Sequence, residues 1–135
     1  MKTKREIAGV LWLGALVTQS VYAAPYTPKK VSAERRAIMN AVRPQLGDGR
    51  HTPVITPYHF KVERGWAYIL GGFDYAGGSK PGGQFAEGSG TNFSVLLRRE
   101  NRKWRVKRFV YNGDVQEPKF IKAFPQAPRA IFKTN

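Results

Sequence analysis

The sequence predicts an α+β fold in which one N-terminal helix packs on a four-stranded antiparallel sheet and a short helix follows near the C-terminus. Three observations predict it. Apolar residues recur at helical spacing in one segment after residue 31, two later segments each form a pair of strands around a tight turn, and the helix precedes all the strands. Helices that are segregated from antiparallel strands are typical of the α+β class.

The first 23 residues have the pattern of a cleavable signal peptide. Lys2, Lys4 and Arg5 form a positive start, Ile7–Val17 is apolar, and a small residue, Ala23, closes the segment. The apolar run has eleven residues, well short of the roughly 20 that a membrane-spanning helix needs. We therefore expect a periplasmic or secreted protein in which residues 24–135 form one small domain.

The predicted helix begins after Ser32, whose side chain can cap it, and runs to about Arg43. Glu34 in the first turn complements the helix dipole. A proline, Pro44, is expected to stop the helix. The apolar stripe expected to face the sheet consists of Val31, Ile38, Ala41 and Val42, and the side chains expected to face solvent are Arg35, Arg36 and Arg43.

The segment Gln45–Pro57 is rich in glycine and proline and is predicted to be a loop. The first pair of strands then covers Tyr58–Glu63 and Trp66–Phe73. The first strand alternates apolar and polar residues, as a half-buried strand does. The second is apolar on both faces, which indicates a strand covered on both sides.

Residues 71–92 contain eight glycines and are predicted to form one long glycine-rich loop. Loops of this length in a compact domain are either functional or disordered. The functional interpretation is a lid or a loop that grips a partner through three aromatic anchors, Phe73, Tyr75 and Phe85, of which Tyr75 and Phe85 are assigned as binding residues.

The second hairpin, Phe93–Tyr111, combines core residues with cations around a turn at residues 100–103. We expect Trp104, Val106 and Val110 to share one face, and Trp66 and Trp104 to lie beneath the helix. The cations expected to contact a partner are Arg98, Arg102, Lys103, Arg105 and Lys107. Beyond the hairpin, one or two helical turns are predicted within Val115–Phe124.

The composition limits the chemistry. The formal net charge is +14, with no cysteine and only two histidines, so thiol catalysis and cysteine-ligated metals are excluded. A site built from Asp48, His51 and His59 is conceivable, but nothing in the spacing enforces it, and the same holds for a carboxylate pair among Asp74, Asp114 and Glu117. We assign no catalytic residue, no metal and no cofactor.

Three hypotheses for function follow. The favoured one is a non-catalytic exported binding or accessory protein whose basic surface contacts an acidic protein or an anionic envelope component, a class that includes inhibitors and immunity proteins. Contact with a membrane surface is compatible with it. The second is a small-ligand pocket protein or enzyme with a cavity between helix and sheet, lined by Tyr58, Trp66 and Tyr68, with His59 or Asp74 as the polar group. The third is nucleic-acid binding, indicated by cations interleaved with aromatic residues in the second hairpin.

Three motifs carry a resemblance: ERRAIMNAVRP at Glu34–Pro44, FKVERGWAY at Phe60–Tyr68 and VLLRRENRKWRV at Val95–Val106. The chain resembles a family of small exported bacterial proteins that share such a helix and such tryptophan-containing strands. The resemblance covers most of residues 24–135 and implies a fold without implying an activity or a site. By analogy at the level of the fold, it is similar to a cystatin-like or NTF2-like roll.

Overall fold

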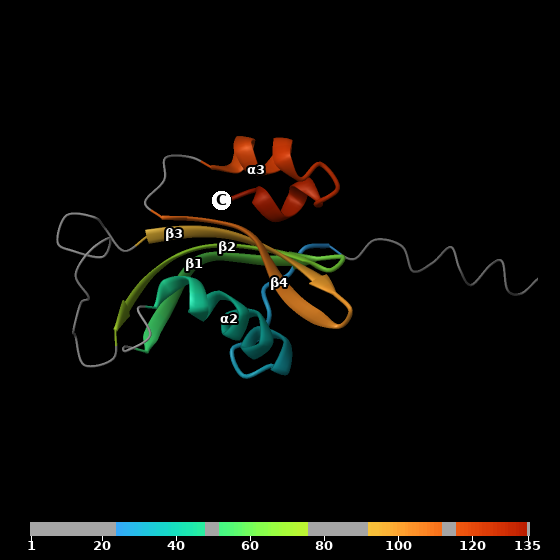
Figure 1. The fold of residues 1–135 in the computed structure, drawn as a ribbon. Helices are drawn as coiled ribbons and strands as arrows, with labels where there is room; N and C mark the ends of the chain where they lie inside the picture. Colours follow the sequence, from blue (N-terminus) through green and yellow to red (C-terminus); the bar gives the residue numbers. More distant parts are fainter. Residues whose placement is uncertain (1–23, 48–51, 76–91, 112–115, 135) are drawn as a thin grey trace, which may run out of the picture.

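The computed structural model describes residues 24–47, 52–75, 92–111 and 116–134. It confirms an α+β fold with a four-stranded antiparallel sheet. The strands lie in chain order and are β1 (Pro53–Glu63), β2 (Trp66–Tyr75), β3 (Asn92–Glu100) and β4 (Lys103–Tyr111). Helix α2 (Ala33–Leu46) lies on one face of the sheet, and α3 (Glu117–Ala123) with the 3-10 helix η3 (Arg129–Phe132) lies on the other (Figure 1). The described part of the chain therefore has three layers.

Helix α2 begins where the sequence predicts and ends later. The Ser32 hydroxyl accepts a hydrogen bond from the backbone N–H of Arg35 at 3.1 Å, as an N-cap does. The prediction that Pro44 stops the helix is wrong, because α2 continues to Leu46. Leu46 is fully buried in the core and the carbonyl of Gln45 accepts a hydrogen bond from the Tyr111 hydroxyl, so tertiary contacts hold the last turn.

The buried side of α2 differs in part from the predicted stripe. Val31 is 85% exposed and precedes the helix, so its assignment to the stripe is wrong. Four residues of α2 enter the first core cluster: Ile38, Met39, Val42 and Leu46. They pack there with side chains from the four strands. Ala41 is half-buried against the same cluster.

Strand β1 starts at Pro53, so the prediction of a loop as far as Pro57 is wrong for its last five residues. A bulge lies between Pro57 and His59 and absorbs one extra residue. Prolines occur in edge strands and at bulges, and β1 is an edge strand. Tyr26 adds a short bridge to its outer side, exchanging two backbone hydrogen bonds with Val62.

Strand β2 is buried on both faces, as its sequence predicts. Ala67 and Ile69 belong to the cluster beneath α2, whereas Trp66 and Tyr68 belong to a second cluster beneath the C-terminal segment. The expectation that Trp66 lies beneath the helix is therefore wrong. β2 also extends to Tyr75, so the predicted loop at 71–92 begins five residues too early, and residues 76–91 lie outside the described residues.

The second hairpin has the predicted turn, with Asn101 and Arg102 at φ angles of 51° and 67°. A bulge between Leu96 and Leu97 shifts the register against β4. Trp104 and Val106 pack on the α2 side, but beyond the bulge the alternation reverses and Val110 packs on the C-terminal side. The prediction that Val110 shares their face is wrong for this reason.

The C-terminal segment closes the second core cluster. Phe120 from α3 and Ile131 from η3 are fully buried against Trp66 and Tyr68. α3 has seven residues, about two turns, and lies within the predicted segment Val115–Phe124, of which Val115 lies outside the described residues. Among the described residues, no helix is both long and apolar enough to cross a membrane.

Candidate anion-binding site

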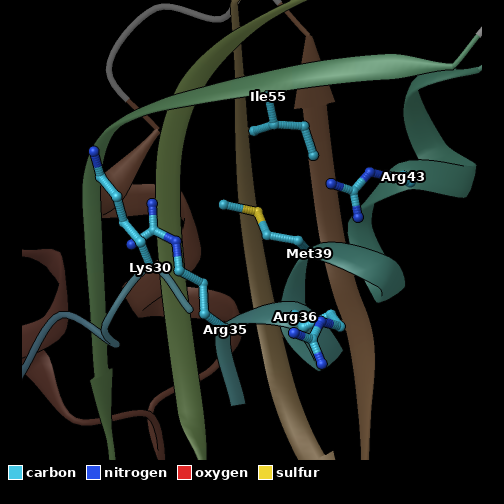
Figure 2. A pocket seen from close by; sticks show the side chains of 6 residues that line it. All are labelled: Lys30, Arg35, Arg36, Met39, Arg43 and Ile55. Atoms are coloured by element: carbon cyan, nitrogen blue, oxygen red, sulfur yellow. The ribbon is translucent and has the colours of Figure 1, made fainter. Parts of the chain in front are cut away.

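Two neighbouring hollows lie at the β1 side of the molecule. The first has a volume of about 290 Å³ and lies between α2, the segment before it and β1 (Figure 2). Its lining consists of four cations and two apolar side chains: Lys30, Arg35, Arg36, Arg43, Met39 and Ile55. In Figure 2, Met39 and Ile55 lie between Lys30 and Arg35 on one side and Arg43 on the other.

The hollow exists because α2 packs mainly toward the β4 edge of the sheet. The N-terminal half of α2 lies beside Trp104, and its C-terminal end is bonded to Tyr111, both on β4. The β1 side of this face is consequently left partly uncovered, and Ile55 remains only half-buried. Arg36, Met39 and Arg43 are spaced by three and four residues, so they share the face of α2 that borders the gap.

The surrounding structure orients two of the guanidinium groups. Arg35 donates from Nη1 to the carbonyl of Pro28 at 3.0 Å, and its guanidinium lies 5.0 Å from the centre of the Phe60 ring. Arg43 donates from Nη1 to Oδ1 of Asn40 at 2.7 Å. An arginine has five N–H donors, so both retain donors for a ligand.

The charge of the hollow is not compensated by its own lining. None of its lining residues is acidic. Two acidic residues of the described segments form ion pairs at other places, Glu63 with Arg64 and Glu100 with Arg105 and Lys107. Met39 is 7% exposed and provides an apolar floor. Cations around a low-dielectric floor attract an anion more strongly than isolated surface cations do.

The second hollow, of about 630 Å³, shares Lys30 and Arg35 with the first and adds Lys61 and His59 from β1. Its other lining residues are Thr27, Pro57, Tyr58, Phe60, Leu70 and Thr134. Its volume is in the range of small-molecule sites. Because two cations line both hollows, the hollows form one continuous basic surface around the edge of β1.

Tyr58 is the exposed aromatic residue of the second hollow. Its side chain is 68% exposed, yet its hydroxyl donates to Oδ1 of Asn92 at 3.1 Å. A Cβ atom on Gly72 would lie 2.5 Å from that hydroxyl, so the end of the ring lies directly over this glycine. The ring is therefore held in place while much of its surface remains open.

The cations predicted as binding residues lie elsewhere, on the β3–β4 hairpin at the other edge of the sheet. Arg105 and Lys107 lie beside the Glu100 carboxylate, at 3.9 Å and 3.1 Å. Arg98 is exposed and stacks over Trp66 at 5.0 Å. Arg102 and Lys103 are exposed at the turn, and Arg102 lines a hollow of about 290 Å³ with Trp104 and Glu34.

Of the predicted aromatic anchors, Phe73 is buried in the first core cluster, so its assignment as an anchor is wrong. Tyr75 ends β2 at the end of the sheet away from the turn at residues 101–102, as its pairing with Pro53 indicates. Phe85 lies outside the described residues. The three arginines of the first hollow, Arg35, Arg36 and Arg43, are predicted from the sequence only to face solvent. The seven-residue spacing of Arg36 and Arg43 nevertheless places them two turns apart on one face.

The polar groups considered for chemistry have structural partners. His59 Nε2 lies 2.6 Å from the carbonyl oxygen of Ile131, and its ring packs edge-on against Tyr68 with centroids 5.6 Å apart. The Tyr68 hydroxyl donates to Oε1 of Glu117 at 3.1 Å. Burial, with a further effect of the Glu117 charge, raises the pKa of Tyr68 well above its usual 10.0.

Two of the candidate acids and one histidine, Asp48, Asp114 and His51, lie outside the described residues. In the segments that the structure describes, no three His, Cys, Asp or Glu side chains gather in a way that could hold a metal ion. Comparison with protein-family models, with curated proteins and with solved structures found no match for this chain.

Proposed function

We propose that this chain is an exported, non-catalytic binding protein whose basic surface contacts an acidic partner. The proposal is supported above all by the first hollow, where Lys30, Arg35, Arg36 and Arg43 surround an apolar floor without a lining carboxylate. Such an arrangement favours an anionic group that is removed from water on one side, since its charge is met by four cations, two of which, Arg35 and Arg43, are oriented by their neighbours.

The partner class follows from the charge and the predicted export. Outside the cytoplasm, the abundant anions are acidic proteins, lipid head groups and cell-wall polymers, and a chain of net charge +14 is attracted to all of them. Inhibitors and immunity proteins are members of this class of binders. Relative to the hairpin cations, the hollow is the better centre of contact, because Arg105 and Lys107 are partly neutralised by Glu100.

A small-ligand pocket protein is the second candidate, and the 630 Å³ hollow favours it. The lining differs from the one predicted from the sequence. Tyr58 and His59 line the hollow, whereas Trp66 and Tyr68 are buried beneath the C-terminal segment. The analogy with a cystatin-like or NTF2-like roll, in which a helix packs on a curved sheet, remains part of this proposal.

Charge reversal tests the proposed function. We expect Arg36→Glu/Arg43→Glu to weaken binding to immobilised heparin, a sulfated polysaccharide, by at least about tenfold at 0.1 M salt, which corresponds to about 1.4 kcal/mol. Binding of the unsubstituted protein should fall steeply as salt is raised. Binding is measured by biolayer interferometry at several salt concentrations.

The matched control is Lys119→Glu/Lys122→Glu on α3, which makes the same change in net charge on the opposite layer, where both lysines are exposed. Arg105→Glu/Lys107→Glu tests the hairpin in the same assay. Equal losses in all three variants would show that only net charge matters and would overturn the choice of site. No binding of the unsubstituted protein to heparin, to anionic vesicles or to an envelope extract would overturn the function itself.

A further inference from the structure

The continuous surface around the edge of β1 combines two kinds of group, cations and an exposed aromatic ring. Cations line both hollows, with the oriented Arg35 among them, and a held, exposed aromatic ring lines the larger one. We propose that this double hollow is a site for a phosphorylated saccharide. In this site the phosphate lies at Lys30 and Arg35, and the sugar ring lies against Tyr58.

The phosphate position follows from the two shared cations. Arg35 is oriented by the Pro28 carbonyl and the Phe60 ring, so its remaining donors are directed before a ligand arrives. A guanidinium can bind a phosphate through two parallel hydrogen bonds, and an ammonium adds a point charge. Lys30 lines both hollows beside it, and Lys61 adds a third cation on the Tyr58 side.

The sugar position follows from Tyr58 and its neighbours. The hydroxyl of Tyr58 is tethered to Asn92 and the ring end lies over Gly72, so little side-chain freedom is lost on binding. Pro57 and Leu70 line the same hollow and supply apolar carbon atoms. An open aromatic ring next to such carbons matches the C–H face of a sugar, while the cations bind its anionic substituent.

The first hollow extends the site to a second anionic group. Arg36 and Arg43 lie beyond the shared pair, around the Met39 floor. A saccharide with two phosphates, or a polymer with one charge per repeating unit, can therefore contact both hollows at once. This inference rests on the proposed function, because it specifies the anionic partner that the basic surface binds.

Two other ligand classes fit the surface less well. A peptide that adds a strand to β1 needs free backbone N–H groups along the edge, but Pro53 and Pro57 have none and Tyr26 already occupies Val62. Single-stranded nucleic acid binds through several successive stacking rings. In the described residues, Tyr58 is the sole ring that is both largely exposed and part of these hollows.

The test compares four probes by isothermal titration calorimetry and by chemical-shift changes in the labelled protein: glucose 6-phosphate, glucose, inorganic phosphate and adenosine monophosphate. We expect glucose 6-phosphate to bind at least about tenfold more tightly than either glucose or phosphate. Equal affinity for glucose 6-phosphate and phosphate would overturn the saccharide assignment, and tighter binding of the nucleotide would overturn it in favour of base stacking.

Variants separate the two halves of the site. Tyr58→Ala should reduce the affinity for glucose 6-phosphate to that for phosphate and leave phosphate binding unchanged, whereas Lys30→Gln should weaken both. Gly72→Ala should act like Tyr58→Ala, since its methyl group displaces the hydroxyl end of the ring. Lys119→Gln is the control that keeps wild-type affinities. An unchanged affinity for glucose 6-phosphate in Tyr58→Ala, with a wild-type melting temperature, would overturn the proposal.

The source of the saccharide is tested by sedimentation with vesicles. Vesicles that contain lipid A, a lipid-anchored phosphorylated disaccharide, are compared with phosphatidylglycerol vesicles of equal charge density. Stronger binding to the lipid A vesicles identifies a lipid-anchored saccharide as the source. Binding of free glucose 6-phosphate with equal binding to both vesicles identifies a soluble saccharide. One combination of results would overturn the saccharide assignment and leave the proposed function standing. In it, the protein binds heparin and Arg36→Glu/Arg43→Glu does not, but no sugar phosphate binds.

Discussion

Gly71 and Gly72, two adjacent glycines in β2, have different roles, the first in strand packing and the second at the candidate site. A Cβ on Gly71 would lie 2.8 Å from the backbone oxygen of Thr56 and 3.1 Å from the Cα of Pro57. A Cβ on Gly72 would meet mainly the end of the Tyr58 side chain. The first glycine therefore allows β1 to approach β2 at the bulge, and the second leaves room for the exposed ring.

We predict that Gly71→Ala destabilises the protein by about 1–3 kcal/mol, because the backbone of β1 must shift. Gly72→Ala should cost less, since a side-chain end can rotate away. Urea denaturation followed by circular dichroism measures both. A smaller loss for Gly71→Ala than for Gly72→Ala would contradict the close approach of the two strands at this point.

Composition alone does not identify such roles. Glycine in a segment rich in glycine predicts a loop, yet Gly71 and Gly72 are strand residues paired with Pro57 and Thr56, next to the bulge in β1. The bulge at Pro57–His59 depends on contacts between residues more than ten positions apart. Local propensity takes no account of those contacts, so it does not predict the bulge.

At the scale of elements, the N-terminus of α2 and the turn of the second hairpin follow local chemistry. Ser32 caps α2 and Asn101 begins the turn, as their side chains and permitted φ angles indicate. Where local chemistry and packing disagree, packing prevails. Pro44 disfavours a continued helix, yet α2 continues past it because Leu46 is buried in the core. Element boundaries are therefore predictable where caps set them.

Removal of the helix cap is expected to weaken the fold without altering the sheet. Ser32→Ala should lower the free energy of unfolding by about 1 kcal/mol, because the N–H of Arg35 loses its acceptor. Ser32→Asp keeps an acceptor at this position and serves as the control. A loss of equal size in both variants would show that the hydroxyl acts through its own bond to the carbonyl of Lys29 instead.

The turn offers a stabilising substitution. Arg102 has a φ of 67°, in the left-handed region that disfavours a residue with a Cβ. Arg102→Gly should raise the free energy of unfolding by about 0.5–1 kcal/mol, since an Asn-Gly pair is the preferred sequence for a turn with two positive φ angles. Thermal unfolding measures the gain, and Arg102→Ala, which keeps the Cβ, should show none.

For the whole molecule, the three layers divide the sheet into a face beneath α2 and a face beneath the C-terminal segment. Two side chains of the sheet join it to the C-terminal layer: His59 contacts the carbonyl of Ile131, and Tyr68 bonds to Glu117 while packing against Phe120 and Phe132. The fold class and the double burial of β2 are evident from the sequence, but the assignment of Trp66 to the C-terminal side is not.

The raised pKa of Tyr68 predicts a dependence of stability on alkaline pH. The folded protein keeps the phenol protonated above pH 10, where the unfolded chain releases the proton. The stabilisation is therefore complete below about pH 9 and is lost progressively as the pH rises above 10. Burial and the Glu34 carboxylate raise the pKa of Tyr26 to about 12, which adds a loss of the same sign.

Tyr68→Phe isolates this effect. At pH 7 it should lower the free energy of unfolding by about 0.5–1.5 kcal/mol, because one hydrogen bond is lost. Between pH 9 and pH 11 the variant should lose less stability than the unsubstituted protein. Parallel curves of unfolding free energy against pH would contradict the assignment of the alkaline loss to Tyr68.

The candidate site was less predictable than the fold. The net charge predicts an anionic partner, and the sequence draws attention to the hairpin because seven cations lie there in one segment. The two hollows together instead gather five cations from three segments, namely Lys30, Arg35, Arg36, Arg43 and Lys61. Their proximity depends on the position of α2 over the sheet, which helical periodicity does not determine.

The prolines of β1 have a consequence for behaviour at high concentration. A sheet edge with a full row of backbone donors is a template on which further chains stack into fibrils. Pro53 and Pro57 remove two of those donors, and the bridge from Tyr26 occupies the far end of the strand. Replacement of both prolines by threonine would restore a continuous template, and we expect thioflavin-positive aggregates from that variant under conditions in which the parent chain stays dispersed.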